Sequence, residues 1–314
     1  PLFHQRQLPA EGVLPARIAI ELTDAALDDT LPPMLAVDRG GVARVRVAGP
    51  EPRVVVDLQP GAAGRVFYLT EPYRIVIDVE ARAARRARNN APVIVLDPGH
   101  GGHEPGAAND RYDLVEAKLA LDIATLTRSR LQSLIPGAHI ILTRDGDTSL
   151  SLEARCALAN SLEADVFVSI HLNAGSGDVT KGGVTTFVLD TTNNRQALRL
   201  AARENGTRTS KVTGIQALLA HHHRSGQSAQ SRELADMIQR TTLDHGRRTL
   251  PSLTDRGVRE AMFYVLVGAR MPAVLVEASF LTYEPEARAL TTPRYRRRLA
   301  SGIASGIAAF LETR

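Results

Sequence analysis

Three apolar, strand-like segments of the chain each end in a polar side chain that could take part in catalysis. Residues 93–97 precede His100, residues 165–170 precede His171, and residues 273–276 precede Glu277. Short apolar runs rich in β-branched residues are typical of buried strands. In open α/β sheets, ligands bind at the carboxyl ends of the strands. If the three strands are parallel neighbours, these three side chains converge at one edge of a sheet.

A fourth candidate, Glu116, lies in the first turn of an amphipathic helix predicted over residues 115–134. Two histidines and one glutamate are a common ligand set of catalytic Zn²⁺, which keeps a fourth position for water. A further carboxylate can then accept a proton from that water. We therefore assign His100, Glu116 and His171 to one zinc ion and Glu277 to the general base, although their spacing is not that of a short metal motif.

The motifs that carry these residues resemble those of the zinc-dependent N-acetylmuramoyl-L-alanine amidases of bacterial cell walls, the type 3 amidase family. The resemblance runs from about residue 93 to the C-terminus and rests on residues 93–102, 106–107, 116, 142–144, 169–174 and 274–277, in the family's order. It implies the same roles for the four residues. It also implies hydrolysis of the amide between N-acetylmuramic acid and L-alanine in peptidoglycan, as in cell-wall remodelling and daughter-cell separation.

Two positions depart from the family pattern. Leu172 stands where a small residue is usual, and residues 278–280 replace a glycine-containing turn. Both changes could alter the wall of the pocket, but neither removes a ligand. Two other interpretations stay open: a zinc carboxypeptidase or endopeptidase acting on wall peptides, and a non-catalytic peptidoglycan-binding protein. The first would have similar site chemistry, whereas the complete ligand set together with Glu277 argues against the second.

Other polar residues near the strand ends receive smaller roles. Asp97 could orient a metal ligand or simply form the turn. Asn173 is the candidate substrate-binding residue, with capping of a turn as the alternative. We expect Arg144 and Arg155 to stabilise loops rather than contact substrate, and His103 to be exposed.

The pattern before residue 81 differs from that of the rest of the chain. After an irregular start over residues 1–15, short alternating runs separated by Gly and Pro turns occupy residues 16–22, 42–47, 53–58, 65–69 and 73–79. They predict a small all-β, sandwich-like domain over residues 1–80. Its end resembles that of the AMIN domain, which is implicated in targeting amidases to the wall or septum. A structural cap without a ligand is the alternative.

The remainder is predicted to be an α/β catalytic domain over residues 92–314, joined by a short Ala/Arg-rich linker at 81–91. Its alternation of strands and helices predicts a mostly parallel or mixed sheet with helices on both faces.

The composition limits the classes of partner. The formal charge of +4 suits an anionic polymer, but Trp is absent and aromatic residues make up 4% of the chain. No stacking platform for nucleic acid is therefore expected. No apolar run approaches the length of a membrane span. We expect a monomer that acts on peptidoglycan, and the family resemblance implies export to the periplasm or cell envelope.

The segment 207–230 has a separate interpretation. It falls where some members of the resembling family carry an inserted helix that blocks the zinc site until an activator protein displaces it. Ile215, Leu218 and Leu219 form a partial helical stripe. Three successive histidines at 221–223 suggest metal binding, but on a helix they could not all face one ion. We hypothesise that this segment is autoinhibitory and that an activator protein relieves the inhibition.

Overall fold

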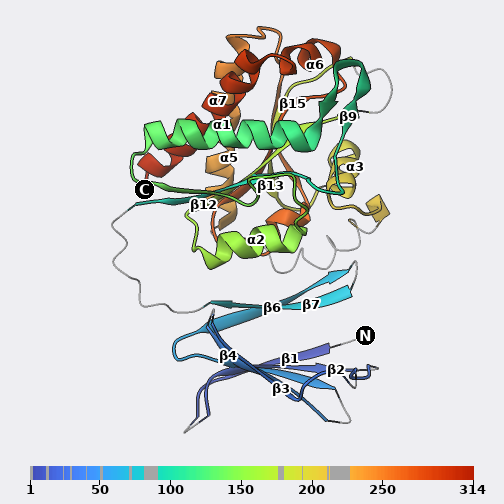
Figure 1. Ribbon diagram of the computed structural model, residues 1–314, viewed down its shortest axis with the longest axis vertical. Coiled ribbons are helices and arrows are strands. Elements are labelled where there is room, and N and C mark those ends of the chain that lie inside the picture. The colour runs from blue at the N-terminus through green and yellow to red at the C-terminus, as the bar shows by residue number, and fades with distance from the viewer. Residues whose placement is uncertain are drawn as a thin grey trace. The chain divides into compact units, whose positions relative to one another are not determined.

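The computed structural model of the chain, drawn in Figure 1, divides into two compact units, Pro1–Asn90 and Ala91–Arg314. It describes residues 3–11, 14–23, 25–28, 30–39, 41–49, 52–70, 73–80, 91–175, 180–192, 194–210, 212 and 227–314. Most of the predicted linker and residues 213–226 of the predicted regulatory segment lie outside the described residues.

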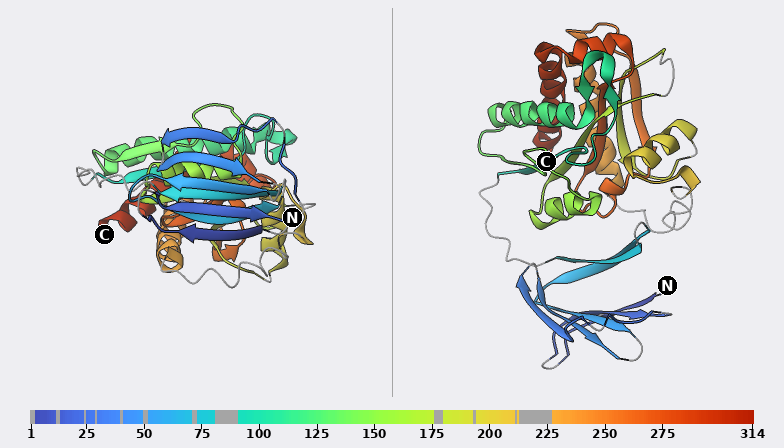
Figure 2. Two further views of the ribbon diagram at one scale, coloured as in Figure 1. Left: turned by 90° about the horizontal axis from the view of Figure 1, so that it is seen from below. Right: turned by 45° about the vertical axis from the view of Figure 1, so that its right-hand side comes forward.

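The N-terminal unit consists of two antiparallel sheets. Five strands pair in the order β1-β2-β5-β4-β3, and β6 pairs with β7. Their bounds are β1 (Phe3–Leu8), β2 (Arg17–Leu22), β3 (Met34–Arg39), β4 (Val42–Ala48), β5 (Arg53–Leu58), β6 (Ala63–Thr70) and β7 (Tyr73–Glu80). Alternate side chains of β2 and β5, such as Ile18 and Val56, form the core, and Val66 and Ile77 of the hairpin pack against it. Figure 2 shows the strands lying side by side. The all-β character expected of this region is present.

The second unit, Ala91–Arg314, contains the predicted catalytic domain and is called the catalytic unit below. It is built on a six-stranded mixed sheet in the order β11-β8-β12-β15-β13-β14. The strands are β8 (Val93–Pro98), β11 (His139–Leu142), β12 (Val166–Asn173), β13 (Val184–Leu189), β14 (Asp255–Ala261) and β15 (Ala273–Phe280). The first four strands in that order are parallel, whereas β13 runs antiparallel to β15 and parallel to β14. The predicted parallel or mixed sheet is therefore confirmed, in its mixed form.

Helices cover both faces of this sheet. One face packs against α1 (Glu116–Leu134), α5 (Gln227–Arg247) and α7 (Pro293–Glu312), and the other against α2 (Leu152–Ser161) and α3 (Arg195–Glu204). The period of two along a strand explains this arrangement, because Ile94 and Leu96 enter one core and Val93 and Val95 enter the other.

Smaller elements complete this unit. They are β9 (Ala108–Asn109), β10 (Leu114–Val115), η1 (Asp110–Tyr112), η2 (Tyr264–Leu266) and α6 (Glu284–Leu290). Among the helices that the structure describes, none combines the length and the apolar character needed to cross a bilayer.

Candidate metal centre

The predicted site residues meet at the carboxyl ends of neighbouring strands. β8 and β12 pair in parallel up to Ile170 opposite Pro98. β12 and β15 pair in parallel with His171 directly opposite Glu277. The chain leaves β8 through Gly99, and His100 follows immediately. The convergence expected from three parallel strands is therefore present.

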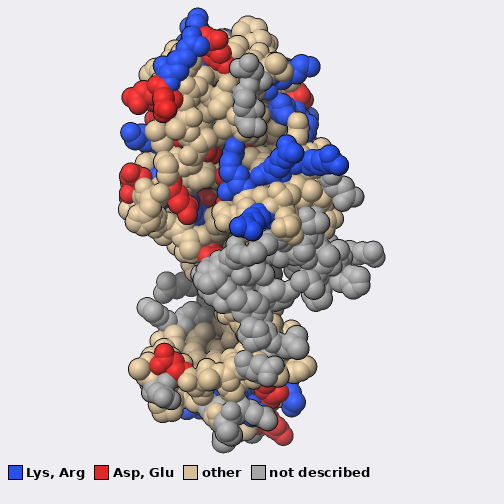
Figure 3. Space-filling model, turned by 90° about the vertical axis from the view of Figure 1, so that its right-hand side faces the viewer, with Lys and Arg blue, Asp and Glu red and all other residues tan. Residues whose placement is uncertain are grey.

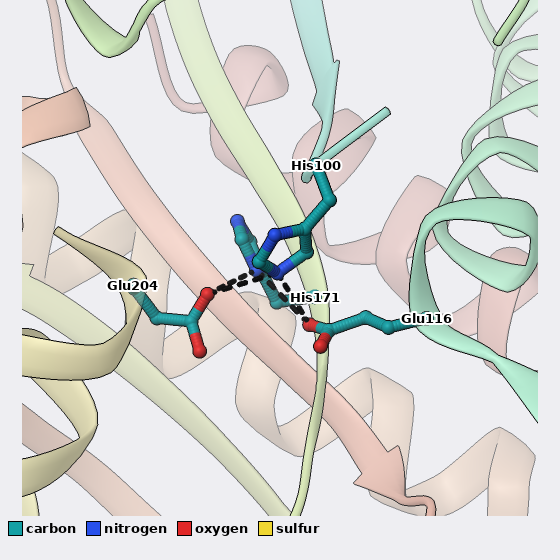
Figure 4. A group of neighbouring side chains, drawn as sticks. All are labelled: His100, Glu116, His171 and Glu204. Atoms are coloured by element: carbon teal, nitrogen blue, oxygen red, sulfur yellow. Dashed lines mark hydrogen bonds and ion pairs between the residues drawn. The ribbon is translucent and has the colours of Figure 1, made fainter. Parts of the chain in front are cut away.

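Two histidines and two glutamates form one compact cluster (Figure 4). His100 Nε2 lies 3.2 Å from Glu116 Oε1 and 3.0 Å from Glu204 Oε2. His171 Nδ1 lies 3.2 Å and 3.1 Å from the same two oxygens. The two imidazole rings meet edge to face, with their centroids 4.9 Å apart. Each nitrogen therefore faces the same pair of carboxylates.

The backbone passes so close to the cluster at two glycines that no side chain would fit there. His100 has a positive φ of 59°, which is uncommon outside glycine. A Cβ at Gly99 would lie 2.3 Å from the His171 ring, and a Cβ at Gly106 would lie 2.6 Å from the ring of His100 and 2.7 Å from Glu116 Oε2. These two glycines let the loop pass directly against three of the four cluster side chains.

Glu116 is held by backbone amides as well as by the histidines. The amide of Ala107 donates to Glu116 Oε2 over 2.8 Å, and the amide of Leu172 donates to Oε1 over 3.1 Å. Burial and the Glu204 carboxylate would raise the pKa of Glu116, but His100 and His171 hold it at about 2. Glu116 is therefore an oriented carboxylate anion at the first residue of α1.

Glu204, the last residue of α3, is a cluster member that the sequence analysis missed. Its side chain is buried, and Arg203 donates to its Oε1 over 2.7 Å. Burial would raise the pKa of Glu204, but His171, His100 and Arg203 hold it well below the ordinary value. The sequence does carry a signal. Ala197, Leu200 and Ala201 form the apolar stripe of α3, and Glu204 occupies the next position on that stripe.

Glu277 is the other buried carboxylate at this edge of the sheet. It is fully buried on β15, and neither carboxylate oxygen has a hydrogen-bond partner in the part of the chain that the structure describes. Burial, followed by the charge of Glu204, raises the pKa of Glu277 to about 8. Buried carboxylates without a partner are rare, and a raised pKa is typical of groups that exchange protons in an active site.

The donor set fits a small divalent cation. Four side chains each offer one ligand atom, and these atoms all lie within 4.8 Å of one another. Ligands about 2.1 Å from a tetrahedral zinc ion are about 3.4 Å apart, close to the nitrogen–oxygen distances of 3.0–3.2 Å found here. Imidazole nitrogen with carboxylate oxygen is a set that zinc accepts.

The raised pKa of His100 also indicates a site for a cation. Although burial would lower it, Glu116 and Glu204 raise the pKa of His100 to about 9. The two carboxylates thus place a strong negative field where a cation would lie.

The other predicted residues lie around the cluster. Among the described residues, the side chains that donate to the Asp97 carboxylate are those of Thr143, Arg155 and Ser169. Asn173 ends β12, where it is half-buried, and its carbonyl accepts from the amide of Leu281. His103 is exposed, as expected.

Arginines lie along α3 beside the cluster. Arg195, Arg199 and Arg203 recur at every fourth residue and are exposed. Figure 3 shows Lys and Arg side chains gathered on the side of the catalytic unit where α3 lies in Figure 1. This positive surface favours the approach of negatively charged molecules.

Comparison with known proteins places the chain in a family. A sequence model described as N-acetylmuramoyl-L-alanine amidase matches residues 94–309. The amidase AmiC of Neisseria meningitidis is 30% identical over 316 residues, which cover 98% of this chain and 68% of that protein. The amidase AmiA of Escherichia coli is 32% identical over 228 residues, covering 69% of this chain and 75% of that protein.

Solved structures agree with the sequence comparison. A Clostridium difficile N-acetylmuramoyl-L-alanine amidase is similar with a TM-score of 0.56 at 30% identity, covering 72% of this chain and 99% of that one. The catalytic domain of CwlV from Paenibacillus polymyxa has a TM-score of 0.52 at 28% identity, covering 71% and 99%. The matched segment contains the four cluster residues and Glu277, and the chain belongs to the N-acetylmuramoyl-L-alanine amidase family that its sequence motifs resemble.

Proposed function

We propose that the chain hydrolyses the amide between the lactyl group of N-acetylmuramic acid and L-alanine of peptidoglycan with one zinc ion, held by His100, Glu116 and His171. The observation that carries this proposal is the meeting of two imidazole nitrogens and a fixed carboxylate beside the buried Glu277, whose carboxylate has no hydrogen-bond partner among the described residues. Zinc bound there would polarise the scissile carbonyl and lower the pKa of the attacking water toward neutrality.

Glu277 is the proposed general base. Without a cation its pKa is raised to about 8, and a nearby positive charge shifts a carboxyl group toward its ionised form. The carboxylate then accepts the proton of the attacking water and returns it to the leaving alanine nitrogen. Because it has no hydrogen-bond partner among the described residues, Glu277 does not have to break an existing interaction to do so.

Substrate binding is proposed for two surfaces near the cluster. Asn173 lies two residues after His171 at the end of β12, within reach of the stem peptide in the proposed complex. The exposed arginines of α3 would attract the carboxylates of stem peptides, which supports peptidoglycan as the partner. The remaining basic residues are scattered along the chain, which does not favour nucleic acid as the partner.

We further propose that Glu204 holds the site closed. A catalytic zinc site keeps one position free for water, whereas four protein ligands complete a structural site. With Glu204 in the cluster, all four positions are taken by side chains. Moving the end of α3 would open one position. The predicted regulatory segment 207–230 begins three residues after Glu204, so an activator protein that binds this segment could move Glu204 from the cluster.

The N-terminal unit is proposed to be an AMIN-like targeting domain. The match to Neisseria meningitidis AmiC covers 98% of this chain and so includes the N-terminal strands. Targeting to the wall or septum, a role in cell division and a location in the periplasm or cell envelope follow from this proposal.

Digestion of purified peptidoglycan tests the activity. The zinc-loaded protein should release free stem peptides that begin with L-alanine and leave peptide-free glycan strands, as read by mass spectrometry. Shortened stems still attached to muramic acid would instead indicate a peptidase. Absence of any product from the wild type and from a variant lacking residues 207–228, with both proteins bound to the wall, would indicate a binding protein.

A further inference from the structure

Arg144, Arg155 and Asp97 form a buried polar network beside the metal cluster. The network joins the three segments that carry the proposed ligands. We propose that Arg144 and Arg155, which share the carbonyl of Pro98, are positioning residues that set the zinc affinity of this site together with Asp97, the partner of Arg155. The inference rests on the proposed zinc site. Neither arginine reaches the substrate in this scheme, because both side chains are buried and directed at backbone carbonyls.

Arg155 is hydrogen-bonded to the turn that carries His100. From α2 it donates to the carbonyl of Pro98 over 2.7 Å and to the carbonyl of His100 itself over 2.8 Å. Its Nη1 also donates to Asp97 Oδ1 over 2.8 Å. One guanidinium group therefore holds two carbonyls of the turn, one two residues before His100 and one of His100 itself. These two hydrogen bonds fix the backbone that sets the direction of the His100 side chain.

Arg144 joins the same turn to the helix of Glu116. It donates to the carbonyls of Pro98 and Gly99 over 3.0 Å and 2.7 Å. Its Nη2 also donates to the carbonyl of Ala117 over 2.8 Å. Since Ala117 follows Glu116, Arg144 holds the His100 turn and the Glu116 backbone at a fixed separation.

Asp97 connects the network to the strand of His171, the third proposed ligand. Its buried carboxylate accepts from Ser169 over 2.7 Å and from Thr143 over 2.6 Å, in addition to Arg155. Ser169 lies two residues before His171 on the same strand, so its side chain is on the same side of β12. The network thus connects His100 through the turn, Glu116 through Ala117 and His171 through Ser169.

The His100 turn needs such support. A non-glycine residue at φ 59° is held in an uncommon conformation, and such conformations persist only where the surroundings impose them. Gly99 lies so close to the His171 ring that a shift of the turn would displace both histidines. Metal ligands must stay near the positions in which they bind the ion. Mutation of the outer residues that orient them typically weakens metal binding about 10–100-fold.

Replacement of each arginine by lysine isolates this role. Lysine keeps the positive charge but offers donors from a single point, so it cannot reproduce the planar fork that reaches several carbonyls at once. Arg296→Lys is the matched control. Arg296 also bonds one carboxylate and one carbonyl, those of Asp122 and Leu290, but it lies on α7 and holds no part of the cluster.

Zinc dissociation constants measured against a competing chelator test the inference in the full chain. We expect Arg155→Lys and Arg144→Lys to bind zinc about 10–100-fold more weakly than wild type, with Arg296→Lys within twofold. The visible absorption of the cobalt-substituted arginine variants should shift as the ligand geometry changes. A loss of stability without altered ligand geometry would not move that spectrum.

Zinc binding within twofold of wild type in folded Arg155→Lys and Arg144→Lys would overturn the inference. Equal weakening in Arg296→Lys would overturn it too, because affinity would then follow stability alone. If neither arginine variant folds, Ser169→Ala decides by the same twofold limit, since it removes one donor to Asp97. A wild type that binds no zinc would refute the proposed metal site itself.

Discussion

The buried carboxylates Asp57 and Glu277, one in each unit of the chain, have different environments. In the N-terminal unit, Asp57 is buried but accepts from Arg44 over 2.5 Å and from Arg46 over 2.6 Å, both on the neighbouring strand. In the catalytic unit, Glu277 is buried with no hydrogen-bond partner among the described residues. A paired buried charge can serve stability, whereas an unpaired one costs stability and marks a place where another charge or a proton is expected.

Loss of the unpaired carboxylate should have the largest effect on activity. In Glu277→Gln we expect turnover of peptidoglycan to fall about 1,000-fold, the size of a general-base contribution. Zinc content should be unchanged because Glu277 is not a proposed ligand. The unfolding temperature should not fall, because the replaced carboxyl group gives up no hydrogen bond to the described residues. Turnover at the wild-type rate would refute the role as base.

Removal of the Glu204 charge should act in the opposite direction. In Glu204→Gln we expect basal turnover to rise about tenfold, which corresponds to roughly 1.4 kcal/mol in the balance between closed and open sites. Gln196→Ala is the control, because it changes an exposed, uncharged side chain on the same helix. Unchanged turnover in a zinc-loaded Glu204→Gln protein would argue against closure, and lost turnover would make Glu204 part of the chemistry.

The two units should also respond oppositely to pH when zinc is removed. Glu116 and Glu204 raise the pKa of His100 to about 9 against burial, and burial raises that of Glu277 to about 8. Both groups keep a proton in the folded state that the unfolded chain releases at lower pH. The metal-free catalytic unit should therefore lose stability as pH rises from about 6.5 to 9.

The contribution of Asp57 to stability should depend on pH in the opposite direction. Burial opposes it, but Arg46 and Arg44 lower the pKa of Asp57 below its ordinary value. Its contribution is present above about pH 4 and is lost as pH falls further. Hydrogen exchange, followed in each unit with a chelator present, can separate the two trends. A catalytic unit that gains stability between pH 6.5 and 9 would contradict the prediction.

The smallest effect is expected from breaking the paired carboxylate. Asp57→Asn should destabilise the N-terminal unit by about 1–2 kcal/mol, because two arginines lose a charged acceptor but remain near solvent. Faster exchange of β4 and β5 amides would report this loss. Hydrolysis of soluble wall fragments should stay at the wild-type rate, and a large loss of that activity would mean that Asp57 has more than a structural role.

Sequence reasoning identified residues where strand pattern and chemistry coincide. His100, His171 and Glu277 follow apolar runs whose burial is visible in the sequence, so their meeting at one edge could be expected. Glu204 could not be found by that rule, because it comes from a helix end and not from a strand. A charged residue on the apolar stripe of α3 was the available sign.

The elements that were missed are strands with little buried surface. β1 was expected to be irregular, and most of its side chains are exposed because it is an edge strand. β3 is the opposite edge strand of the same sheet, and most of its described side chains are exposed as well. Backbone pairing with a neighbour specifies these strands, and that information does not appear in hydrophobic periodicity.

The ligand-bearing elements also determine when metal can be acquired. His100 follows β8, Glu116 begins α1 and His171 lies on β12, so long stretches of chain separate them. Bringing them together requires the sheet to have formed first. The proposed site would then bind zinc only in a chain that has completed its catalytic unit, and the bound ion would protect that whole unit against unfolding by mass action. Metal loading thus becomes a marker of finished folding.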